Sequence, residues 1–329
     1  MNRNEKLRLK IFESYSQNLQ GIFVREGWKL GIENAIGKVD ELNEFYYCPI
    51  CGIPFLRESL NQNVPNPLTL EDVPPQRLGG RKIILTCKNC NNSLGGTKLD
   101  SKLIWDMRMR PFLERKRDSH IDVYYNLNDR AKIKGKLNLI EDRKFQIDFG
   151  ALIHPKLRAE LDFLTTNWSQ SKINFRIQTP NPYLVNLALL RISYLIMISH
   201  FGFGYFFNPT SRIIREQLQK PDIKLIPDFG IPRIDAFPCD QRGIFIITKP
   251  DNLKSFMVVF DLKNNNETRT YCVIIPGPEM NCIDIYQELN RIREFRYDTK
   301  LVVEFGNYIY MQDPYAYYKL WEANKENAL

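Results

Sequence analysis

Two C-x-x-C motifs, Cys48-Pro49-Ile50-Cys51 and Cys87-Lys88-Asn89-Cys90, are the strongest signal in this 329-residue chain. Each motif can supply two thiolates to one tetrahedral zinc ion, and two motifs complete a closed four-cysteine site. A closed site has no open coordination position, so the zinc is expected to be structural, in a module with a small core of its own. A thioredoxin-like redox motif needs only one pair, in a βαβ setting that neither pair has. The spacing therefore predicts one Zn²⁺ per chain, bound by Cys48, Cys51, Cys87 and Cys90.

The segment between the two motifs carries further signals. It reads Leu70-Glu71-Asp72-Val73-Pro74-Pro75-Gln76-Arg77-Leu78-Gly79-Gly80, with an acidic pair before two prolines and then a Gly-Gly turn. Asn91 follows the fourth cysteine directly. The apolar pattern predicts strands over residues 68–73 and 82–86, and a helix that starts at Asn91 or Asn92 and runs to about Arg117.

These motifs, spread over residues 44–110, resemble the HNH endonucleases, and most of all the branch with zinc-binding C-x-x-C pairs that includes endonuclease VII-like proteins. The resemblance implies a ββα-metal unit, in which a β-hairpin packs on a helix. It also implies a catalytic Mg²⁺ or Mn²⁺, with Glu71 as the acidic ligand and Asn91 as the ligand at the start of the helix. Apart from the resemblance, Arg77 and Arg81 on the loop are expected to contact the scissile phosphate or the strand beside it through charge-assisted hydrogen bonds.

Asp72 stands where the family has the histidine that activates water. The three histidines of the chain, His120, His154 and His200, all lie outside the module. A free aspartate has a pKa of about 3.9, so it is a weak base at neutral pH unless it is desolvated. It can instead act as a further oxygen ligand of the divalent ion, so that a metal-bound hydroxide attacks. Two interpretations stay open: an active nuclease, and a degenerate module that only binds nucleic acid.

The charge of the chain is concentrated in one segment. Lys and Arg number 46 against 38 Asp and Glu, which gives a net charge of +8. Residues 77–117 contain eleven cations and three acids, so this window alone accounts for the whole excess. Basic side chains on a nuclease-like helix are placed to neutralise phosphates. The residues predicted to bind nucleic acid are Arg81, Lys82, Lys88, Lys98, Lys102, Arg108 and Arg110.

The remainder of the chain offers no comparable motif. Its composition predicts an N-terminal helical segment over residues 1–43, the module over 44–117 and a mixed α+β domain over 118–329 for targeting, sensing or oligomerisation. Helices are expected at 5–35, 155–166, 182–200, 210–219 and 314–324. Strands are expected at 121–125, 132–139, 144–149, 243–248, 255–262, 270–275 and 301–305.

Several classes of protein are excluded by the composition. Seven cysteines are too few, and odd in number, for a disulfide framework in a chain of this length. The most apolar region, residues 184–207, is interrupted by Asn186, Arg191 and His200 and is better interpreted as a buried core helix than as a membrane span. No signal peptide is recognised at the N-terminus, so the cytoplasm is the expected location.

Together these observations predict an α+β protein in which a zinc-stapled, HNH-like module precedes a larger α+β domain. The expected activity is hydrolysis of DNA phosphodiester bonds by a metal-dependent endonuclease, of the kind common in bacterial and phage defence. The expected partners are double-stranded DNA and a second copy of the chain or a regulatory protein, and not a membrane. The alternatives are a non-catalytic module that binds nucleic acid, and a partner-binding protein whose activity lies wholly in residues 118–329.

Overall fold

The computed structural model describes residues 1–26, 45–117, 119–127, 131–141, 144–148, 158, 162, 166, 173–177, 179–227, 240–264, 267–278, 282–291, 298–305 and 309–324. They form two compact units. Unit 1 comprises Met1–Ser101 together with Pro182–Leu329, and unit 2 comprises Lys102–Asn181, inserted between those two parts. The predicted α+β class is confirmed. The boundaries between the units lie after residues 101 and 181, whereas the composition predicted boundaries after residues 43 and 117. The difference arises because residues 45–101 pack with the segment that begins at residue 182.

Unit 1 begins with helix α1 (Arg3–Glu26), the described part of the helix predicted over 5–35. Its first turn is closed by a reciprocal cap between Asn2 and Glu5: the Glu5 amide donates to Asn2 Oδ1 at 2.9 Å, and the Asn2 amide donates to Glu5 Oε2 at 2.8 Å. One face of the helix is buried and carries Ile11, Phe12, Tyr15, Leu19, Ile22 and Phe23. Residues 27–35 of the predicted helix lie outside the described residues.

Residues 45–101 form the cysteine module. A short ribbon of β1 (Tyr46–Tyr47) and β2 (Pro54–Phe55) carries the first motif, and the turn η2 (Arg57–Leu60) follows. The hairpin of β3 (Leu68–Val73) and β4 (Arg81–Cys87) is antiparallel, with Leu68 opposite Cys87. After Cys87 the chain becomes helical and passes through the π-helical segment η4 (Cys90–Leu99) into α3 (Asp100–Leu113). The predicted order of strand, strand and helix is confirmed.

The Gly-Gly turn of the hairpin is required by its geometry. After the turn η3 (Gln76–Leu78), Gly79 adopts φ 88°, a left-handed conformation that glycine tolerates best. A Cβ on Gly80 would lie 1.4 Å from the Pro74 carbonyl oxygen, so no side chain fits there. Two glycines thus let the two ends of the loop approach each other closely.

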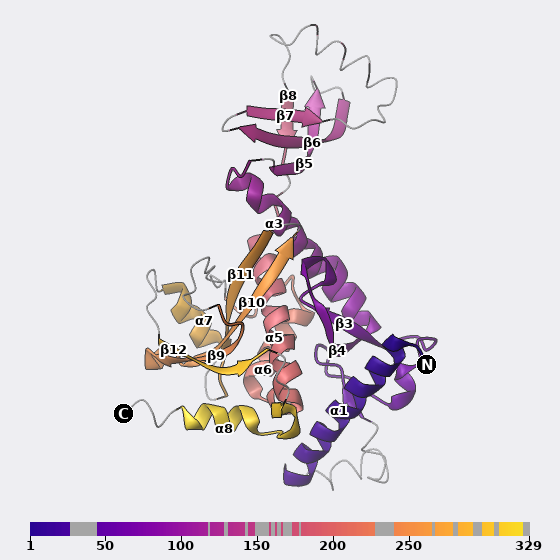
Figure 1. The fold of residues 1–329 in the computed structure, drawn as a ribbon, viewed down its shortest axis with the longest axis vertical. Coiled ribbons are helices and arrows are strands. Elements are labelled where there is room, and N and C mark those ends of the chain that lie inside the picture. The colour runs from indigo at the N-terminus through magenta and orange to yellow at the C-terminus, as the bar shows by residue number, and fades with distance from the viewer. Residues whose placement is uncertain are drawn as a thin grey trace. The chain divides into compact units, whose positions relative to one another are not determined.

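Helix α5 (Pro182–Phe206) is the centre of unit 1, between the β3–β4 hairpin and the second sheet (Figure 1). It is long and apolar enough to cross a membrane by length and composition alone, but 89% of its most apolar window is buried inside the protein. The prediction of a core helix is therefore confirmed. Gly202 interrupts the helix at φ 63°, and α6 (Pro209–Gln219) follows with Asn208 as its cap.

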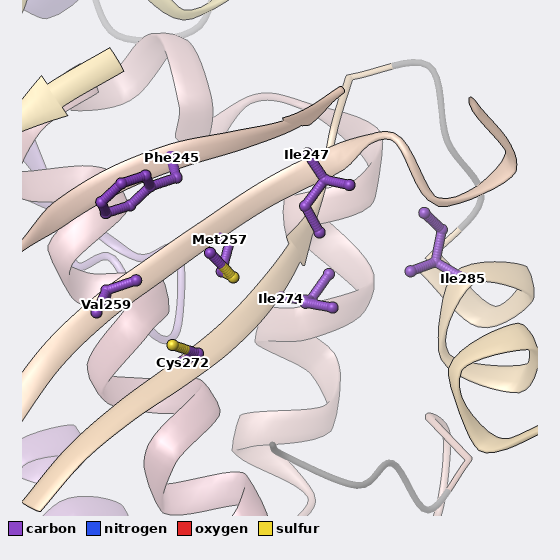
Figure 2. Packing of buried hydrophobic residues seen from close by; sticks show 7 residues of the cluster. All are labelled: Phe245, Ile247, Met257, Val259, Cys272, Ile274 and Ile285. Carbon is purple, nitrogen blue, oxygen red and sulfur yellow. The ribbon is translucent and has the colours of Figure 1, made fainter. Parts of the chain in front are cut away.

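The second sheet of unit 1 has four antiparallel strands in the order β11-β10-β9-β12. They are β9 (Gly243–Lys249), β10 (Ser255–Asn264), β11 (Glu267–Pro276) and β12 (Asp298–Glu304), all close to prediction. On one face, Phe256 contacts Phe201 of α5 and Trp321 of α8 (Ala316–Ala323). On the other face, Met257 and Ile274 pack with Ile285 of α7 (Cys282–Arg291) (Figure 2). Short turns η6 (Asp251–Leu253) and η7 (Ile309–Gln312) complete the unit.

Unit 2 is an antiparallel sheet in the order β7-β6-β5-β8. Its strands are β5 (Ser119–Leu127), β6 (Ala131–Glu141), β7 (Lys144–Asp148) and β8 (Ile173–Arg176). Met109 and Phe112 of α3 cover the face that carries Ile121, Val123, Leu137 and Leu139. The predicted three-stranded meander is confirmed, and β8 adds a strand that the sequence pattern did not predict. The helix predicted at 155–166 lies largely outside the described residues.

Candidate metal centre

Four cysteine side chains meet between the β1–β2 ribbon and the end of the hairpin. The sulfur atoms of Cys48, Cys51, Cys87 and Cys90 all lie within 4.8 Å of one another. The Sγ atoms of Cys51 and Cys87 are 3.9 Å apart. Zn–S bonds of about 2.3 Å at tetrahedral angles place neighbouring sulfurs about 3.8 Å apart, so the four thiols fit one tetrahedral metal ion such as zinc. The predicted ligand set is brought together as a closed cluster.

The surroundings of the cluster favour a buried, structural centre. Cys48, Cys87 and Cys90 are buried and Cys51 is partly exposed. Burial raises the pKa of the Cys48 thiol, whereas hydrogen bonds from Cys48 and then Cys51 lower the pKa of Cys87. The backbone amide of Cys87 also donates to Cys48 Sγ at 3.4 Å. A bound cation would favour thiolates at all four positions.

The first cysteine motif is held by the helices that follow unit 2 in sequence. The Tyr194 hydroxyl of α5 donates to the Pro49 carbonyl at 2.8 Å. The side-chain amide of Gln219, the last residue of α6, donates to the Ile50 carbonyl at 3.0 Å. Both acceptors lie between the two cysteines of the motif. The loop of the first cysteine motif is therefore held in place by the core of unit 1.

Glu71, expected as the acidic ligand of a catalytic ion, is buried in an ion pair. Its side chain is 3% exposed, and Oε1 accepts from Nη2 of Arg191 at 2.8 Å. Oε2 accepts from the Thr86 hydroxyl at 2.7 Å. Arg191 is 1% exposed and also reaches Asp100 Oδ1, at 3.3 Å from its Nη1. Each carboxylate oxygen of Glu71 thus accepts a hydrogen bond, and the cation beside it is a guanidinium.

The electrostatics of this triad are mutually dependent. Burial raises the pKa of Asp100 to about 6, although Arg191 acts in the opposite direction. For Arg191, burial opposes the charged form, but the charges of Glu71 and Asp100 outweigh it and raise the pKa. A guanidinium that is out of water remains charged because two carboxylates face it. The positive charge of Arg191 would oppose the binding of a divalent ion at Glu71.

Asp72 and Asn91 occupy different environments from that of Glu71. A bulge in the hairpin separates Glu71 from Asp72, which lies opposite Lys82 and is partly exposed. Desolvation raises the pKa of Asp72, and Lys82 acts against it. The side-chain amide of Asn91 donates from Nδ2 to Thr69 Oγ1 at 3.0 Å and to the Leu70 carbonyl at 3.3 Å. The structure therefore places Asn91 against β3, where its amide group joins the helix to the hairpin.

The predicted phosphate-binding cations belong to two separate units. Those of unit 1 that are exposed on the hairpin and its flanks are Arg77, Arg81, Lys82 and Lys88. Lys98 is exposed and forms an ion pair with Asp222 at 2.8 Å. Unit 2 carries Lys102, Arg108 and Arg110, of which Arg110 is half-buried in an ion pair with Asp106. Of the predicted cations, Arg77, Arg81 and Lys82 lie at the loop end of the hairpin, and Lys88 follows the other end of β4.

Sequence reasoning missed Arg191 and Asp100 as partners of Glu71. A signal was present, because an arginine inside an otherwise apolar core helix needs a buried acid. Comparison with known proteins adds no relative: no protein-family model, curated protein or solved structure matches this chain. The resemblance to HNH endonucleases therefore rests on the motifs of residues 44–110 alone.

Proposed function

We propose that this protein binds duplex DNA through a zinc-stapled, HNH-like module that does not cut it. The observation that carries this proposal is the buried pair of Glu71 with Arg191, since the acid expected to hold a catalytic ion is committed to a guanidinium. Thr86 occupies its second oxygen. With this carboxylate buried beside a fixed positive charge, the hairpin and helix would act as a scaffold.

Zinc is the metal proposed for the four-cysteine cluster. Four thiolates at tetrahedral spacing suit Zn²⁺, and oxygen-preferring ions such as Mg²⁺ are not bound by such a set. The bound ion would supply folding free energy. Cys48 and Cys51 would join the ribbon to Cys87 and Cys90 at the start of the helix.

DNA binding is supported by the charge of the hairpin. Arg77, Arg81, Lys82 and Lys88 are all exposed. Cations that neutralise phosphates release condensed counterions, so affinity falls steeply as salt rises. This binding would depend on the backbone and not on the base sequence.

A metal-dependent HNH endonuclease, in a setting such as bacterial or phage defence, is the second candidate. It is favoured by Asp72, a partly exposed carboxyl at the end of β3 whose pKa is raised by desolvation. In this version Asp72, with Asn91 and Glu71, would hold Mg²⁺ or Mn²⁺, and Arg77 would contact the phosphate. The ion would supply an activated water or stabilise the leaving oxygen.

One experiment separates the two candidates. Zinc-loaded protein is incubated with supercoiled plasmid in Mg²⁺ and in Mn²⁺, and a mobility shift on the same DNA is recorded in parallel. We expect a salt-sensitive shift with the plasmid left supercoiled. Nicking that EDTA abolishes and that Asp72→Ala removes, with the shift retained, would establish the endonuclease instead. Absence of both the shift and nicking would refute DNA binding.

A further inference from the structure

The four cysteines of the metal centre differ in their access to solvent. Cys51 is partly exposed, whereas Cys48, Cys87 and Cys90 are buried. The chain leaves the centre towards the surface directly after Cys51, since Ile53, two residues further on, is 51% exposed. Cys51 is therefore the ligand that a small solute reaches first.

Cys87 is the buried thiol in position to react with Cys51. Their Sγ atoms are 3.9 Å apart, and the two residues belong to different motifs. A disulfide has an S–S bond of about 2.05 Å, so each sulfur would have to move by about 1 Å. A bond between them would link the β1–β2 ribbon to the end of β4, the two segments that the proposed zinc also links.

We propose that the four-cysteine centre is a redox switch: a hydroperoxide oxidises Cys51, a disulfide forms between Cys51 and Cys87, and the site releases its zinc. Cys48 and Cys90 would remain as two thiolate ligands, which is half of the set that a closed zinc site requires. This inference rests on the zinc proposed for the cluster. It is independent of whether the module binds DNA or cuts it.

Two thiolates supply the two electrons that reduce one molecule of hydrogen peroxide. In the first step the Cys51 thiolate attacks a peroxide oxygen: an S–O bond forms, the O–O bond breaks and hydroxide leaves, which yields a sulfenic acid. In the second step the Cys87 thiolate attacks the Cys51 sulfur: an S–S bond forms, the S–O bond breaks and a second hydroxide leaves. Solvent protonates both hydroxides to water.

The contacts that hold the first motif do not depend on its sulfur atoms. Tyr194 and Gln219 bind the carbonyls of Pro49 and Ile50, which lie between the two cysteines of the motif. In the oxidised chain these contacts and the disulfide would keep the loop beside the end of β4. Reduction by a dithiol should therefore restore a site that binds zinc again, so the switch is reversible.

The first test uses the full wild-type chain, loaded with zinc and treated with hydrogen peroxide. A chromogenic chelator follows the released zinc, dimedone traps sulfenic acid, and mass spectrometry of unreduced peptides maps disulfides. We expect release of about one zinc per chain, with dimedone on Cys51 before any other ligand and then a disulfide between Cys51 and Cys87. Dithiothreitol and added zinc should restore the metal content.

The second test compares Cys51→His with a matched control, Cys90→His. Histidine is also a zinc ligand but forms no disulfide, so each variant keeps four ligands. Cys51→His lacks the accessible thiolate and should release zinc about tenfold or more slowly than wild type. Cys90→His keeps the reacting pair and should release it at about the wild-type rate. Metal analysis before peroxide is added verifies that each variant holds zinc.

Three results would overturn the switch: zinc retained at peroxide concentrations that oxidise free N-acetylcysteine, oxidation of a buried ligand before Cys51, or equal release from Cys51→His and wild type. Peptide mapping of the wild-type chain decides the question even if a variant fails to hold zinc. A wild-type chain that binds no zinc before peroxide is added would refute the proposed metal, and the switch with it.

Discussion

Arg191 of α5 and Glu71 of β3 form an ion pair at 2.8 Å, with both side chains almost inaccessible to water. The two residues are 120 positions apart, and unit 2 lies between them in the sequence. The pair ties the hairpin of the cysteine module to the central helix of unit 1. It therefore makes the module part of a larger folding unit, and it decides what Glu71 can do chemically.

Replacing Arg191 by methionine should lower the free energy of unfolding by about 3–5 kcal/mol, because Glu71 and Asp100 would be left as buried charges without a positive charge beside them. Urea unfolding of the zinc-loaded protein measures the loss. Arg212→Met is the matched control: Arg212 pairs with Glu216 on the surface of α6, and its loss should cost less than about 1 kcal/mol.

The triple variant Arg191→Met/Glu71→Gln/Asp100→Asn tests the electrostatic cause. It leaves no buried charge, so it should recover most of the stability that Arg191→Met loses. A triple variant as unstable as the single one would mean that packing around the arginine stem, and not charge, accounts for the loss.

Asp100 predicts a pH dependence of stability. Its pKa is raised to about 6 in the folded protein, above the value of about 3.9 for an unfolded chain. Between these values the folded state holds the proton more tightly, so the contribution of Asp100 to stability is fully present below pH about 4 and is lost as pH rises through about 6. Asp100→Asn should flatten this part of the stability curve relative to wild type. Chemical denaturation at a series of pH values measures the difference, and parallel curves for the two proteins would contradict the prediction.

Much of the local structure could be predicted because strong periodicity marks it. Strand β3 was predicted at its observed bounds, and the four cysteines were placed in one site from their spacing alone. Helix α7 was missed although Ile285 and Leu289 stand four residues apart, because the helix is only ten residues long. Strand β8 was missed because it has only four residues. It is defined by its antiparallel pairing with β5, which a local sequence pattern does not show.

The neighbours of the candidate site could not be predicted in the same way. The partner of Glu71 comes from a helix more than a hundred residues away, and no local pattern encodes such a pairing. Arg191 can be recognised in the sequence as a charged residue in an apolar helix, but the sequence does not show that Glu71 and Asp100 are its acidic partners. The same limit applies to Lys82 and Asn4, which meet only because α1 packs against β4.

Removal of the metal should unfold more than the cysteine module. Tyr194 and Gln219 hold the loop of the first motif, so its disorder would withdraw both contacts from α5 and α6. Cys87→Ser should abolish binding of about one zinc per chain and lower the helix signal in circular dichroism. Cys272→Ser is the matched control, since this buried cysteine of β11 is not among the four and should retain the metal. Full zinc content in the Cys87 variant would contradict the four-cysteine site.

Asn18 should be the most sensitive polar residue of α1, because it satisfies the irregular backbone at the kink of α5. Its Oδ1 accepts from the Phe203 amide at 2.8 Å, and its Nδ2 donates to the Met311 carbonyl at 2.8 Å. Gly202 adopts φ 63° directly before Phe203, and a Cβ there would lie 2.4 Å from Asn18 Oδ1. Asn18→Ala would leave a buried donor and a buried acceptor unpaired, at about 1–3 kcal/mol for each. Thermal or urea unfolding measures the change against Gln17→Ala, an exposed neighbour on the same helix that should shift stability by about 0.5 kcal/mol or less. Equal effects of the two substitutions would show that Asn18 does not support the kink.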